Sequence, residues 1–254
     1  MTTKRKIALI TGGSRGLGKD MALRLAENGI DVIVTYRSGK AEAEAVVKEI
    51  VGFGANGATL ELSAGEIKTF PTFVSNLTGV LTKQFNTDKI DFLVNNAGIG
   101  LHASFNETTE DQFDFLMNVH FKAVYFLTQK LLPLIEDGGR IINISTGLTR
   151  FSNPGYSAYA SMKAAVETLT RYMARELGSR KIAVNTVAPG AIETDFAGGF
   201  VRDNKAVNKQ IADVTALGRV GLPEDIGGVV AFLCSENGRW VNGQRIEVSG
   251  GMNL

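Results

Sequence analysis

Apolar runs alternate with amphipathic stretches along the whole chain. The short runs are rich in Val, Ile and Leu, as expected of buried strands, and they lie at residues 6–10, 31–35, 57–62, 90–94, 140–144, 182–187 and 244–248. Between them, apolar residues at helical spacing predict helices near residues 17–28, 40–52, 66–85, 109–136, 157–178 and 224–235. This alternation is typical of repeated βα units, so we expect an α/β fold with a seven-stranded parallel sheet.

Helix starts and loops add detail to this prediction. Thr108 with Asp111 resembles a capping box before the fourth helix, and Pro223 followed by two acidic residues suits the first turn of the last helix. The longest irregular stretch runs from residue 188 to about residue 204 and contains a Pro-Gly and a Gly-Gly pair. Loops of this length are usually functional or mobile, so this stretch is the predicted lid.

The composition is that of an ordinary globular protein. Of 254 residues, 44% are hydrophobic and 21% are charged, and residues 1–254 are expected to form a single domain. The formal net charge of +1 gives no reason to expect a nucleic-acid or membrane-surface partner. No apolar run reaches the roughly 20 residues of a membrane span, and the run after the basic N-terminus is cut short at Thr11. We therefore expect a cytoplasmic protein.

Cysteine and histidine are scarce in the chain. The single cysteine, Cys234, lies in an apolar run, so it is expected to pack in the core and suits a reducing compartment. His102 and His120 have no cysteine or carboxylate cluster beside them. No dedicated metal site is therefore expected.

A glycine-rich turn follows the first predicted strand and directly precedes the first predicted helix. Residues 11–18 read TGGSRGLG. Glycines allow a tight turn and a close backbone approach, while the free N–H groups and the dipole at a helix start attract a phosphate. A glycine-rich turn often marks only a change of direction, but its position here favours dinucleotide binding. Its Gly-x3-Gly-x-Gly spacing differs from the Gly-x-Gly-x2-Gly of the common Rossmann fingerprint.

A candidate catalytic pair lies in the fifth predicted helix. Tyr159 and Lys163 are four residues apart, which places a phenol and an ammonium on one helix face. Another hydroxyl, that of Thr146, stands thirteen residues before Tyr159, with Ser145 next to it. A Tyr-to-Lys pair at this spacing also arises by chance, so its weight depends on the motifs that accompany it.

Five motifs occur in the order shared by the short-chain dehydrogenase/reductases, and the likeness extends from residue 7 to the end of the chain. They are Thr11-Gly12-x3-Gly16-x-Gly18, Asn95-Asn96-Ala97-Gly98, Asn118, Tyr159-x3-Lys163 and Pro189-Gly190. The chain resembles the classical branch of this family and is most similar to its 3-oxoacyl-acyl-carrier-protein-reductase-like members. The resemblance implies a doubly wound Rossmann-type fold with helices on both faces of the sheet, NAD(P)(H) binding, and hydride transfer between the cofactor and a carbonyl or alcohol. It also implies a homotetramer that pairs the helices near 109–136 and 157–178.

The resemblance also implies roles for residues of this chain. Tyr159 is expected to exchange a proton with the substrate oxygen, Lys163 to bind the nicotinamide ribose, and Thr194 to contact the nicotinamide carboxamide. Asn118 is either a satisfied polar group in the core or the anchor of a water in a proton relay to Lys163. The expected catalytic residues are Asn118, Thr146, Tyr159 and Lys163. The expected cofactor-binding residues are Gly12, Ser14, Arg15, Gly16, Leu17, Gly18, Arg37, Ser38, Leu62, Ser63, Asn95, Ala97, Gly98, Tyr159, Lys163, Pro189, Gly190, Ile192 and Thr194.

Two positions depart from the family pattern. Thr146 stands where Ser is usual; its hydroxyl can still hydrogen-bond a substrate oxygen, while its methyl group narrows the site. We expect Thr146 rather than Ser145 to supply the catalytic hydroxyl. Ser63 stands where an Asp that contacts the adenine is common, and a Ser hydroxyl can make a similar bond.

Residues around the second predicted strand favour NADP(H) over NAD(H). A carboxylate near the adenosine ribose favours NAD, whereas an Arg accommodates the extra phosphate of NADP. Asp31 precedes the strand and so lies at the wrong end, because ligands of such sheets sit beyond the carboxyl ends of strands. Arg37 follows the strand, and together with Arg15 it is expected to bind the phosphate through charge-assisted hydrogen bonds. The alternative is that both arginines are solvated surface residues.

Proton transfer by Tyr159 requires its pKa to fall. A free tyrosine has a pKa near 10, so bringing it near neutrality takes roughly 4 kcal/mol. One cation about 4 Å away, at an effective dielectric constant of about 20, contributes about that much. We therefore expect Lys163, together with the oxidised nicotinamide ring, to lower the pKa of Tyr159.

These features predict an NADPH-dependent ketoreductase that transfers hydride between the cofactor and a carbonyl or secondary alcohol, with a 3-oxoacyl thioester as one candidate substrate. One alternative is a dehydrogenase of sugars, polyols or secondary alcohols. Another is a non-catalytic protein that senses NADP(H), although such a protein would be expected to have lost Tyr159 or Lys163. Partly apolar walls of the substrate site are expected from Phe151, Tyr156, Phe196 and Phe200.

Overall fold

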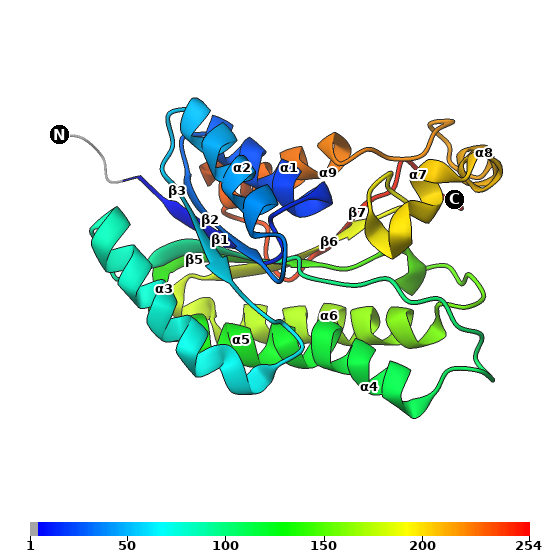
Figure 1. Ribbon diagram of the computed structural model, residues 1–254, viewed down its shortest axis with the longest axis horizontal. Coiled ribbons are helices and arrows are strands. Elements are labelled where there is room, and N and C mark those ends of the chain that lie inside the picture. The colour runs from blue at the N-terminus through cyan, green and yellow to red at the C-terminus, as the bar shows by residue number, and fades with distance from the viewer. Residues whose placement is uncertain (1–4) are drawn as a thin grey trace.

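Seven parallel strands form the centre of the computed structural model, which describes residues 5–254 (Figure 1). The strands lie in the order β3-β2-β1-β4-β5-β6-β7. Their bounds are β1 (Ile7–Ile10), β2 (Asp31–Tyr36), β3 (Gly57–Glu61), β4 (Ile90–Asn95), β5 (Ile135–Ile144), β6 (Ala183–Pro189) and β7 (Arg245–Val248). Every predicted strand is a strand of this sheet, so the predicted α/β fold is confirmed.

Helices cover both faces of the sheet (Figure 1). One face carries α1 (Gly16–Glu27), α2 (Lys40–Gly52) and α9 (Glu224–Cys234). The other face carries α3 (Phe70–Phe85), α5 (Ala123–Leu131) and α6 (Ser157–Glu176). Because both faces are covered, the central strands are buried along almost their whole length, and this explains why they read as continuous apolar runs.

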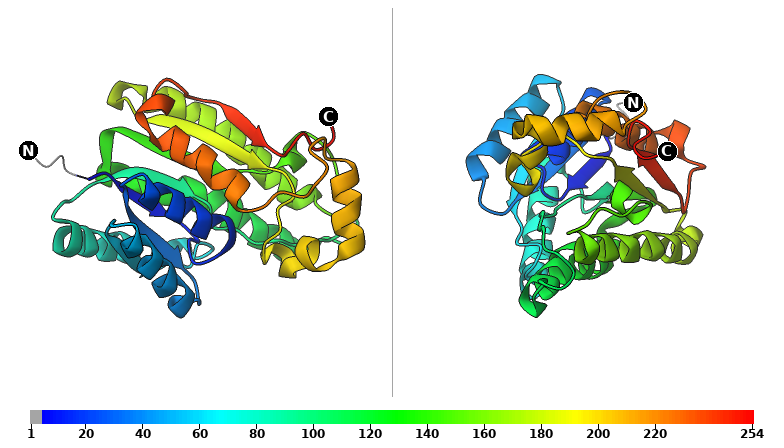
Figure 2. Two further views of the ribbon diagram at one scale, coloured as in Figure 1. Left: turned by 90° about the horizontal axis from the view of Figure 1, so that it is seen from above. Right: turned by 90° about the vertical axis from the view of Figure 1, so that its right-hand side faces the viewer.

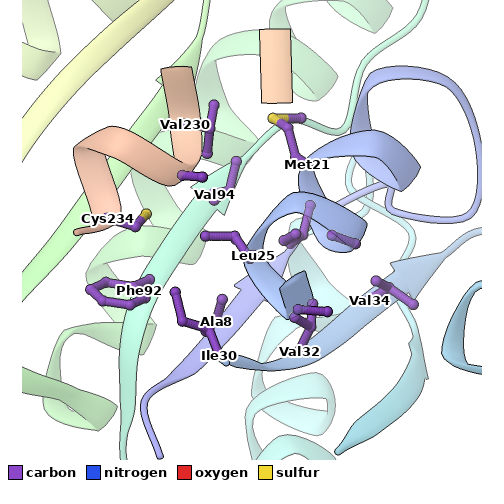
Figure 3. Close-up of a cluster of buried hydrophobic side chains, with 14 of the residues drawn as sticks. Ala8, Met21, Leu25, Ile30, Val32, Val34, Phe92, Val94, Val230 and Cys234 are labelled. Carbon is purple, nitrogen blue, oxygen red and sulfur yellow. The ribbon is translucent and has the colours of Figure 1, made fainter. Parts of the chain in front are cut away.

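One apolar core lies between the sheet and the helices α1 and α9 (Figure 3). Met21 of α1, Phe92 of β4 and Val230 of α9 meet there. Fully burying an aliphatic or aromatic side chain of this size stabilises a fold by about 1.5–3 kcal/mol. Cys234 lies in the same core as a free thiol, as predicted, and burial raises its pKa to about 12. The thiol is therefore an unreactive packing group.

The order of strands reverses at β1. β2 and β3 lie on one side of β1, and β4 to β7 lie on the other. Open sheets of this kind bind ligands beyond the carboxyl ends of the strands, at the point of reversal. The glycine-rich turn follows β1 and the Asn-Asn-Ala-Gly segment follows β4, so both lie at this point.

The helix predicted over residues 109–136 is divided in the structure. α4 (Glu110–Met117) is followed by a π-helical turn, Asn118–Lys122, and then by α5. A 3-10 turn containing Pro133 ends the helical stretch, and β5 begins at Ile135. Proline lacks the N–H that a continuing helix needs, which explains the end of the helix at this point.

The capping box lies one residue later than predicted. The hydroxyl of Thr109 accepts a hydrogen bond from the N–H of Gln112 at 3.2 Å, and the side chain of Gln112 accepts one from the N–H of Thr109 at 3.1 Å. Thr108 instead donates its hydroxyl to the carbonyl oxygen of Ser104. Each threonine is followed three positions later by a residue that can complete a capping box, so the sequence pattern is compatible with two start positions for this helix.

The predicted lid is only partly irregular. The loop from residue 190 to 204, called the lid loop below, contains a 3-10 turn (Phe196–Gly199) and α7 (Phe200–Asp203). A helix that the sequence pattern did not predict, α8 (Lys205–Asp213), follows and is capped by Asn204, which accepts two N–H groups of its first turn. α7 and α8 lie together at the end of the molecule that also holds the C-terminus (Figure 2).

None of the helices within residues 5–254 is long and apolar enough to cross a membrane. No group of three His, Cys, Asp or Glu side chains gathers there in a way that could hold a metal ion.

Candidate active site

Asn96, directly after β4, holds the glycine-rich turn. Its amide donates hydrogen bonds to the carbonyl oxygens of Thr11 and Gly12 at 2.9 and 3.0 Å. The hydroxyl of Thr11 in turn accepts from the N–H groups of Asn96 and Ala97 at 2.9 and 3.0 Å. A Cβ atom at Gly18 would lie 2.1 Å from the carbonyl oxygen of Gly12, so α1 fits against this turn only with glycine at position 18.

The start of α1 suits an anionic group. The helix begins at Gly16, has no acidic residue in its first turn, and has no side chain bonded to its free N–H groups. Arg15 precedes it with a side chain that is 71% exposed and lies 3.8 Å from Asp195 of the lid loop. Leu17 packs against the core and fixes the first turn. These residues fit the diphosphate of a dinucleotide.

Arg37 and Ser38 follow β2 at the same edge of the sheet, and both are exposed. Within residues 5–254, Arg37 makes no hydrogen bond or ion pair. The hydroxyl of Ser14 lies 3.8 Å from the Cβ position of Gly39, so the glycine-rich turn adjoins the end of β2. The unpaired guanidinium of Arg37 is therefore free to bind an anion beside this turn.

Asp31 lies at the opposite, amino end of β2. Its carboxylate accepts hydrogen bonds from the backbone and side-chain N–H groups of Asn56 at 2.7 and 3.0 Å, and lies 3.5 Å from Arg5. Asp31 therefore stabilises the loop that leads to β3.

The other residues expected on the adenosine side have mixed surroundings. Leu62 is buried in the core, and the amide of Asn95 donates hydrogen bonds to two buried neighbours at 3.0 and 2.8 Å. Both of these side chains stabilise the sheet. Half-buried or exposed positions at the strand ends are taken by Ser63, Ala97 and Gly98.

Tyr159 and Lys163 lie on one face of α6, next to the end of β5. Both side chains are buried, with 7% of Tyr159 and 4% of Lys163 exposed. Lys163 Nζ donates a hydrogen bond to the carbonyl oxygen of Ile144 at 2.8 Å and lies 5.9 Å from the centre of the Tyr159 ring. The predicted pair is therefore assembled, with the ammonium held by the strand.

The two hydroxyls at the end of β5 face different partners. The hydroxyl of Thr146 accepts a hydrogen bond from the N–H of Leu148 at 3.3 Å and lies beside the phenol of Tyr159, whose pKa it lowers. The hydroxyl of Ser145 donates to Glu167 at 2.6 Å. Thr146 is therefore the hydroxyl beside the phenol, and Ser145 faces a carboxylate.

The pKa of Tyr159 differs from the expectation. Burial raises it above the ordinary value, and the Thr146 hydroxyl only partly opposes this rise. Burial also lowers the pKa of Lys163 to about 8. Because the ammonium is bonded to Ile144 rather than to the phenol, the groups of the chain do not by themselves bring Tyr159 near neutrality.

Asn118 is the first residue of the π-helical turn and is half-buried. α6 packs against this turn, so Asn118 and Lys163 belong to adjoining elements. No direct hydrogen bond between their side chains occurs in the described part of the chain. π-Helical turns inside helices are frequent at functional sites.

Arg245 of β7 and Glu167 of α6 hold the segment that carries Thr146. Arg245 donates hydrogen bonds to Glu167 at 2.9 Å and to the carbonyl oxygen of Thr146 at 3.2 Å. Glu167 also accepts the hydroxyls of Ser145 and Thr149 at 2.6 and 2.8 Å. No sequence motif predicted this contact, because Arg245 lies far along the chain from the residues it holds.

The lid loop covers both the glycine-rich turn and Tyr159. The Thr194 side chain lies 3.5 Å from the Cβ position of Gly16. The ring of Phe196 lies 5.9 Å from that of Tyr159, between ring centres. A substrate that reaches Tyr159 would therefore contact the lid loop.

Aromatic side chains surround Tyr159 in part as predicted. Tyr156 lies 6.5 Å from Tyr159 between ring centres, and His102 meets Tyr156 edge-on at 5.1 Å. Phe151 instead packs beneath the guanidinium of Arg150 at 5.3 Å. Phe200 is half exposed at the start of α7. Of the four predicted walls, Tyr156 and Phe196 contact Tyr159.

The end of β6 leads directly into the lid loop. Pro189 is the last residue of β6, and Gly190 follows it with its backbone against Ser249. Ile192 pairs with Gly221 and, together with Ser249, lines a cavity of about 240 Å³.

His120 was not expected near the catalytic pair, and the structure buries it there. Its ring meets that of Tyr159 edge-on, with 5.0 Å between the ring centres. A lone histidine in an apolar stretch is an ordinary core residue in most sequences, so no pattern singled it out.

The chain matches known proteins over nearly its whole length. A family model described as enoyl-(acyl carrier protein) reductase matches residues 12–253. The hydroxynaphthalene reductase-like protein Arp2 of Metarhizium brunneum (strain ARSEF 3297) is 37% identical, over 97% of this chain and 94% of that protein. The 3-oxoacyl-[acyl-carrier-protein] reductase FabG of Staphylococcus aureus (strain Mu50 / ATCC 700699) is 37% identical over 98% of each.

A solved structure agrees with these relatives. The angucycline C-6 ketoreductase LanV, crystallised with bound NADP, superposes with a TM-score of 0.93 at 37% identity, over 98% of this chain and 96% of that one. The motifs, the fold and these relatives all lead to one assignment. The chain belongs to the short-chain dehydrogenase/reductase family and is an NAD(P)-dependent oxidoreductase.

Proposed function

We propose that the protein is an NADPH-dependent ketoreductase. The observation that carries the proposal is the Thr146 hydroxyl beside the phenol of Tyr159, with the buried ammonium of Lys163 on the same face of α6 as Tyr159. A ketone oxygen placed between the two hydroxyls would accept a hydrogen bond from each. Tyr159 lies under the lid loop, which also touches the glycine-rich turn.

The chain's own residues supply the proton of the reaction. When bound, a reduced nicotinamide would supply the hydride that adds to the carbonyl carbon. Tyr159 would give its phenolic proton to the carbonyl oxygen, so that one hydride and one proton convert the ketone to a secondary alcohol. Lys163 would stabilise the phenolate left on Tyr159 until a proton from solvent replaces the one transferred. Thr146 would hold the substrate oxygen in line with Tyr159.

Arg15 and Arg37 support a preference for NADPH. They flank the junction between the glycine-rich turn and the end of β2, and the guanidinium of Arg37 is unpaired within residues 5–254. A 2′-phosphate would gain charge-assisted hydrogen bonds from these groups. Asp31, bonded to Asn56, does not compete for this position. The bound NADP of the similar ketoreductase LanV is consistent with this choice.

The walls of the site support a flat aromatic ketone as substrate. Phe196 and Tyr156 lie within 6.5 Å of the Tyr159 ring, and His102 extends the same wall. Aromatic faces of this kind stack on fused rings more favourably than on a linear acyl chain. Two similar proteins carry names that refer to a hydroxynaphthalene and to an angucycline. A linear 3-oxoacyl thioester is the second candidate, by similarity to the 3-oxoacyl reductase.

The test is a substrate screen with purified protein. Oxidation of NADPH is followed with a bicyclic aryl ketone, a linear 3-oxoacyl thioester and an enoyl thioester, and Tyr159→Phe serves as the inactive control. Turnover of a ketone that Tyr159→Phe abolishes supports the proposal. Binding of NADPH without turnover of any carbonyl would favour a sensor, and turnover confined to secondary alcohols with NADP+ would favour a dehydrogenase.

We also propose that the protein is a homotetramer that pairs α4, α5 and α6 with those of another copy. These helices expose five aromatic side chains, each at least 37% exposed: Phe113, Phe115, Tyr125, Phe126 and Tyr172. Such a concentration of exposed aromatic residues is typical of a surface that another protein covers.

A further inference from the structure

The π-helical turn places His120 between α6 and the loop that follows β4. The side chain of His120 is 0% exposed. Its Nε2 atom lies 2.9 Å from the carbonyl oxygen of Ile99, and its ring stands at 87° to that of Tyr159. A Cβ atom at Gly98 would lie 2.9 Å from His120 Cε1, so the imidazole fits there because position 98 is glycine.

The contact with Ile99 determines which ring nitrogen of His120 carries the proton. Nε2 lies 2.9 Å from the carbonyl oxygen of Ile99 and 3.3 Å from its backbone N–H. The shorter contact is to an acceptor, which favours the tautomer in which Nε2 carries the hydrogen and Nδ1 is left as an acceptor. Nδ1 is buried and has no hydrogen-bond partner among the described residues. Burial and the nearby Lys163 ammonium lower the pKa of His120 well below its ordinary value, so the ring stays neutral and Nδ1 stays an acceptor.

A buried acceptor without a partner is rare in folded proteins. Nearly all such atoms are bonded to protein groups or to ordered water, and a buried water commonly bonds about three polar groups. The titratable groups that face His120 are Tyr159 and Lys163, both from α6. The loop after β4 faces it with the backbone of Gly98 and Ile99. A water on Nδ1 would therefore lie among the residues through which Tyr159 is expected to recover its proton.

We propose that His120 is a positioning residue for proton transfer: its Nδ1 accepts a hydrogen bond from the water that carries protons between Asn118 and Lys163. This role rests on the proposed ketoreductase function. As the substrate oxygen gains its proton, the O–H bond of Tyr159 breaks. Lys163 then gives a proton to the phenolate of Tyr159, the water replaces the proton on Lys163, and solvent replaces the one on the water. His120 neither gains nor loses a proton and only orients the water.

The kinetic test compares three variants with the wild type in ketone reduction. His120→Phe keeps a ring against Tyr159 but removes Nδ1. It is expected to lower kcat about tenfold and to change KM less than twofold. The solvent deuterium isotope effect on kcat is expected to increase. His120→Gln restores an acceptor oxygen and is expected to recover kcat to within about threefold of the wild type. Thr170→Val, a buried polar-to-apolar change elsewhere on α6, is expected to lower Tm without changing the isotope effect. Wild-type kcat and isotope effect in His120→Phe, or equal losses in His120→Phe and His120→Gln, would overturn the proposal.

A structural test is independent of activity. A high-resolution crystal structure of the wild type is expected to show a water within hydrogen-bond distance of His120 Nδ1, and the same position is expected to be dry in His120→Phe. If the wild type has no such water, the proposal is wrong whatever the protein reduces. If the water is present and no ketone is reduced, the proposed function fails while the assignment of the water to Nδ1 stands.

Discussion

Two adjacent hydroxyls show how much of the chemistry depends on single side chains. Thr146 and Ser145 differ by one position at the end of β5, yet the Thr146 hydroxyl lies beside the phenol of Tyr159 whereas that of Ser145 donates to Glu167. Strand geometry explains the difference, because successive side chains point to opposite faces. The motif spacing predicted this choice, since it counts thirteen residues back from Tyr159.

We predict that Thr146→Val lowers kcat/KM about 100-fold or more, as loss of a hydrogen-bond donor to the reacting oxygen does in other enzymes. Ser145→Ala is the matched control and is expected to stay within about tenfold, because its hydroxyl supports Glu167 rather than the substrate. Steady-state kinetics with the best ketone of the screen measures both. Full activity of Thr146→Val together with loss of activity in Ser145→Ala would contradict the assignment.

The buried Lys163 leads to a prediction about stability and pH. Its pKa is about 8 in the folded protein and near 10.4 in an unfolded chain. Between these values the unfolded state holds more protons than the folded one, so the free energy of unfolding rises with pH across this range. Lys163→Met removes the effect, and its Tm minus that of the wild type is expected to fall by a few degrees from pH 7 to pH 9.5.

Scanning calorimetry of both proteins across this pH range measures the difference. Lys130→Met, which changes an exposed lysine, is the control and is expected to show a Tm difference that does not depend on pH. A constant or rising Tm difference for Lys163→Met would show that burial does not lower the pKa of Lys163 in the folded protein.

The motif positions were predictable from the sequence, whereas the residues that support them were not. The glycines, Tyr159 and Lys163 have fixed local spacings. Arg245 and His120 act through contacts that the fold creates, and neither lies in a pattern of its own. Long-range contacts of this kind leave no periodic signal in one sequence.

At the level of elements, six strands were predicted to within two residues because buried parallel strands are continuous apolar runs. The fifth begins at Ile135 rather than at residue 140, because its first residues include two acidic residues and two glycines and are mostly not buried. Two helical features were missed. The π-helical turn at Asn118 changes the hydrogen-bond pattern without changing the apolar periodicity. α8 has nine residues and no fully buried one, and its half-buried apolar positions Val207 and Ile211 form a stripe too short to predict a helix.

The contact between α1 and α9 gives a test at this scale. A Cβ atom at Gly227 of α9 would lie 2.0 Å from a carboxylate oxygen of the buried Asp20 on α1. We predict that Gly227→Ala lowers the free energy of unfolding by about 1–3 kcal/mol, because the buried Asp20 carboxylate must be displaced or the two helices must move apart. Gly228→Ala is the matched control: a Cβ there meets nothing within 4 Å, and alanine is expected to stabilise the helix by up to about 1 kcal/mol. Urea unfolding of the wild type and the two variants measures both changes in the free energy of unfolding. Equal effects of the two substitutions would argue against close packing at Gly227.

For the whole molecule, the proposed tetramer makes a prediction about mass in solution. Tyr172, on α6, is 64% exposed in the single chain. Tyr172→Glu is expected to shift the protein from about four chains to one or two in light scattering after gel filtration, because a buried unpaired carboxylate opposes association. Phe53→Glu, at the end of α2, changes a 48% exposed aromatic residue and is expected to leave the mass unchanged. A wild-type monomer would contradict the tetramer.

In the proposed reaction, the hydroxyls of Tyr159 and Thr146 act on a ketone beside a cofactor recognised by Arg15 and Arg37. The most direct test is the measurement of kcat/KM for NADPH and for NADH with a bicyclic aryl ketone. We predict that NADPH is preferred at least about tenfold, as two charge-assisted contacts to the extra phosphate imply. Equal use of the two cofactors, a preference for NADH, or no ketone reduction with either would contradict it.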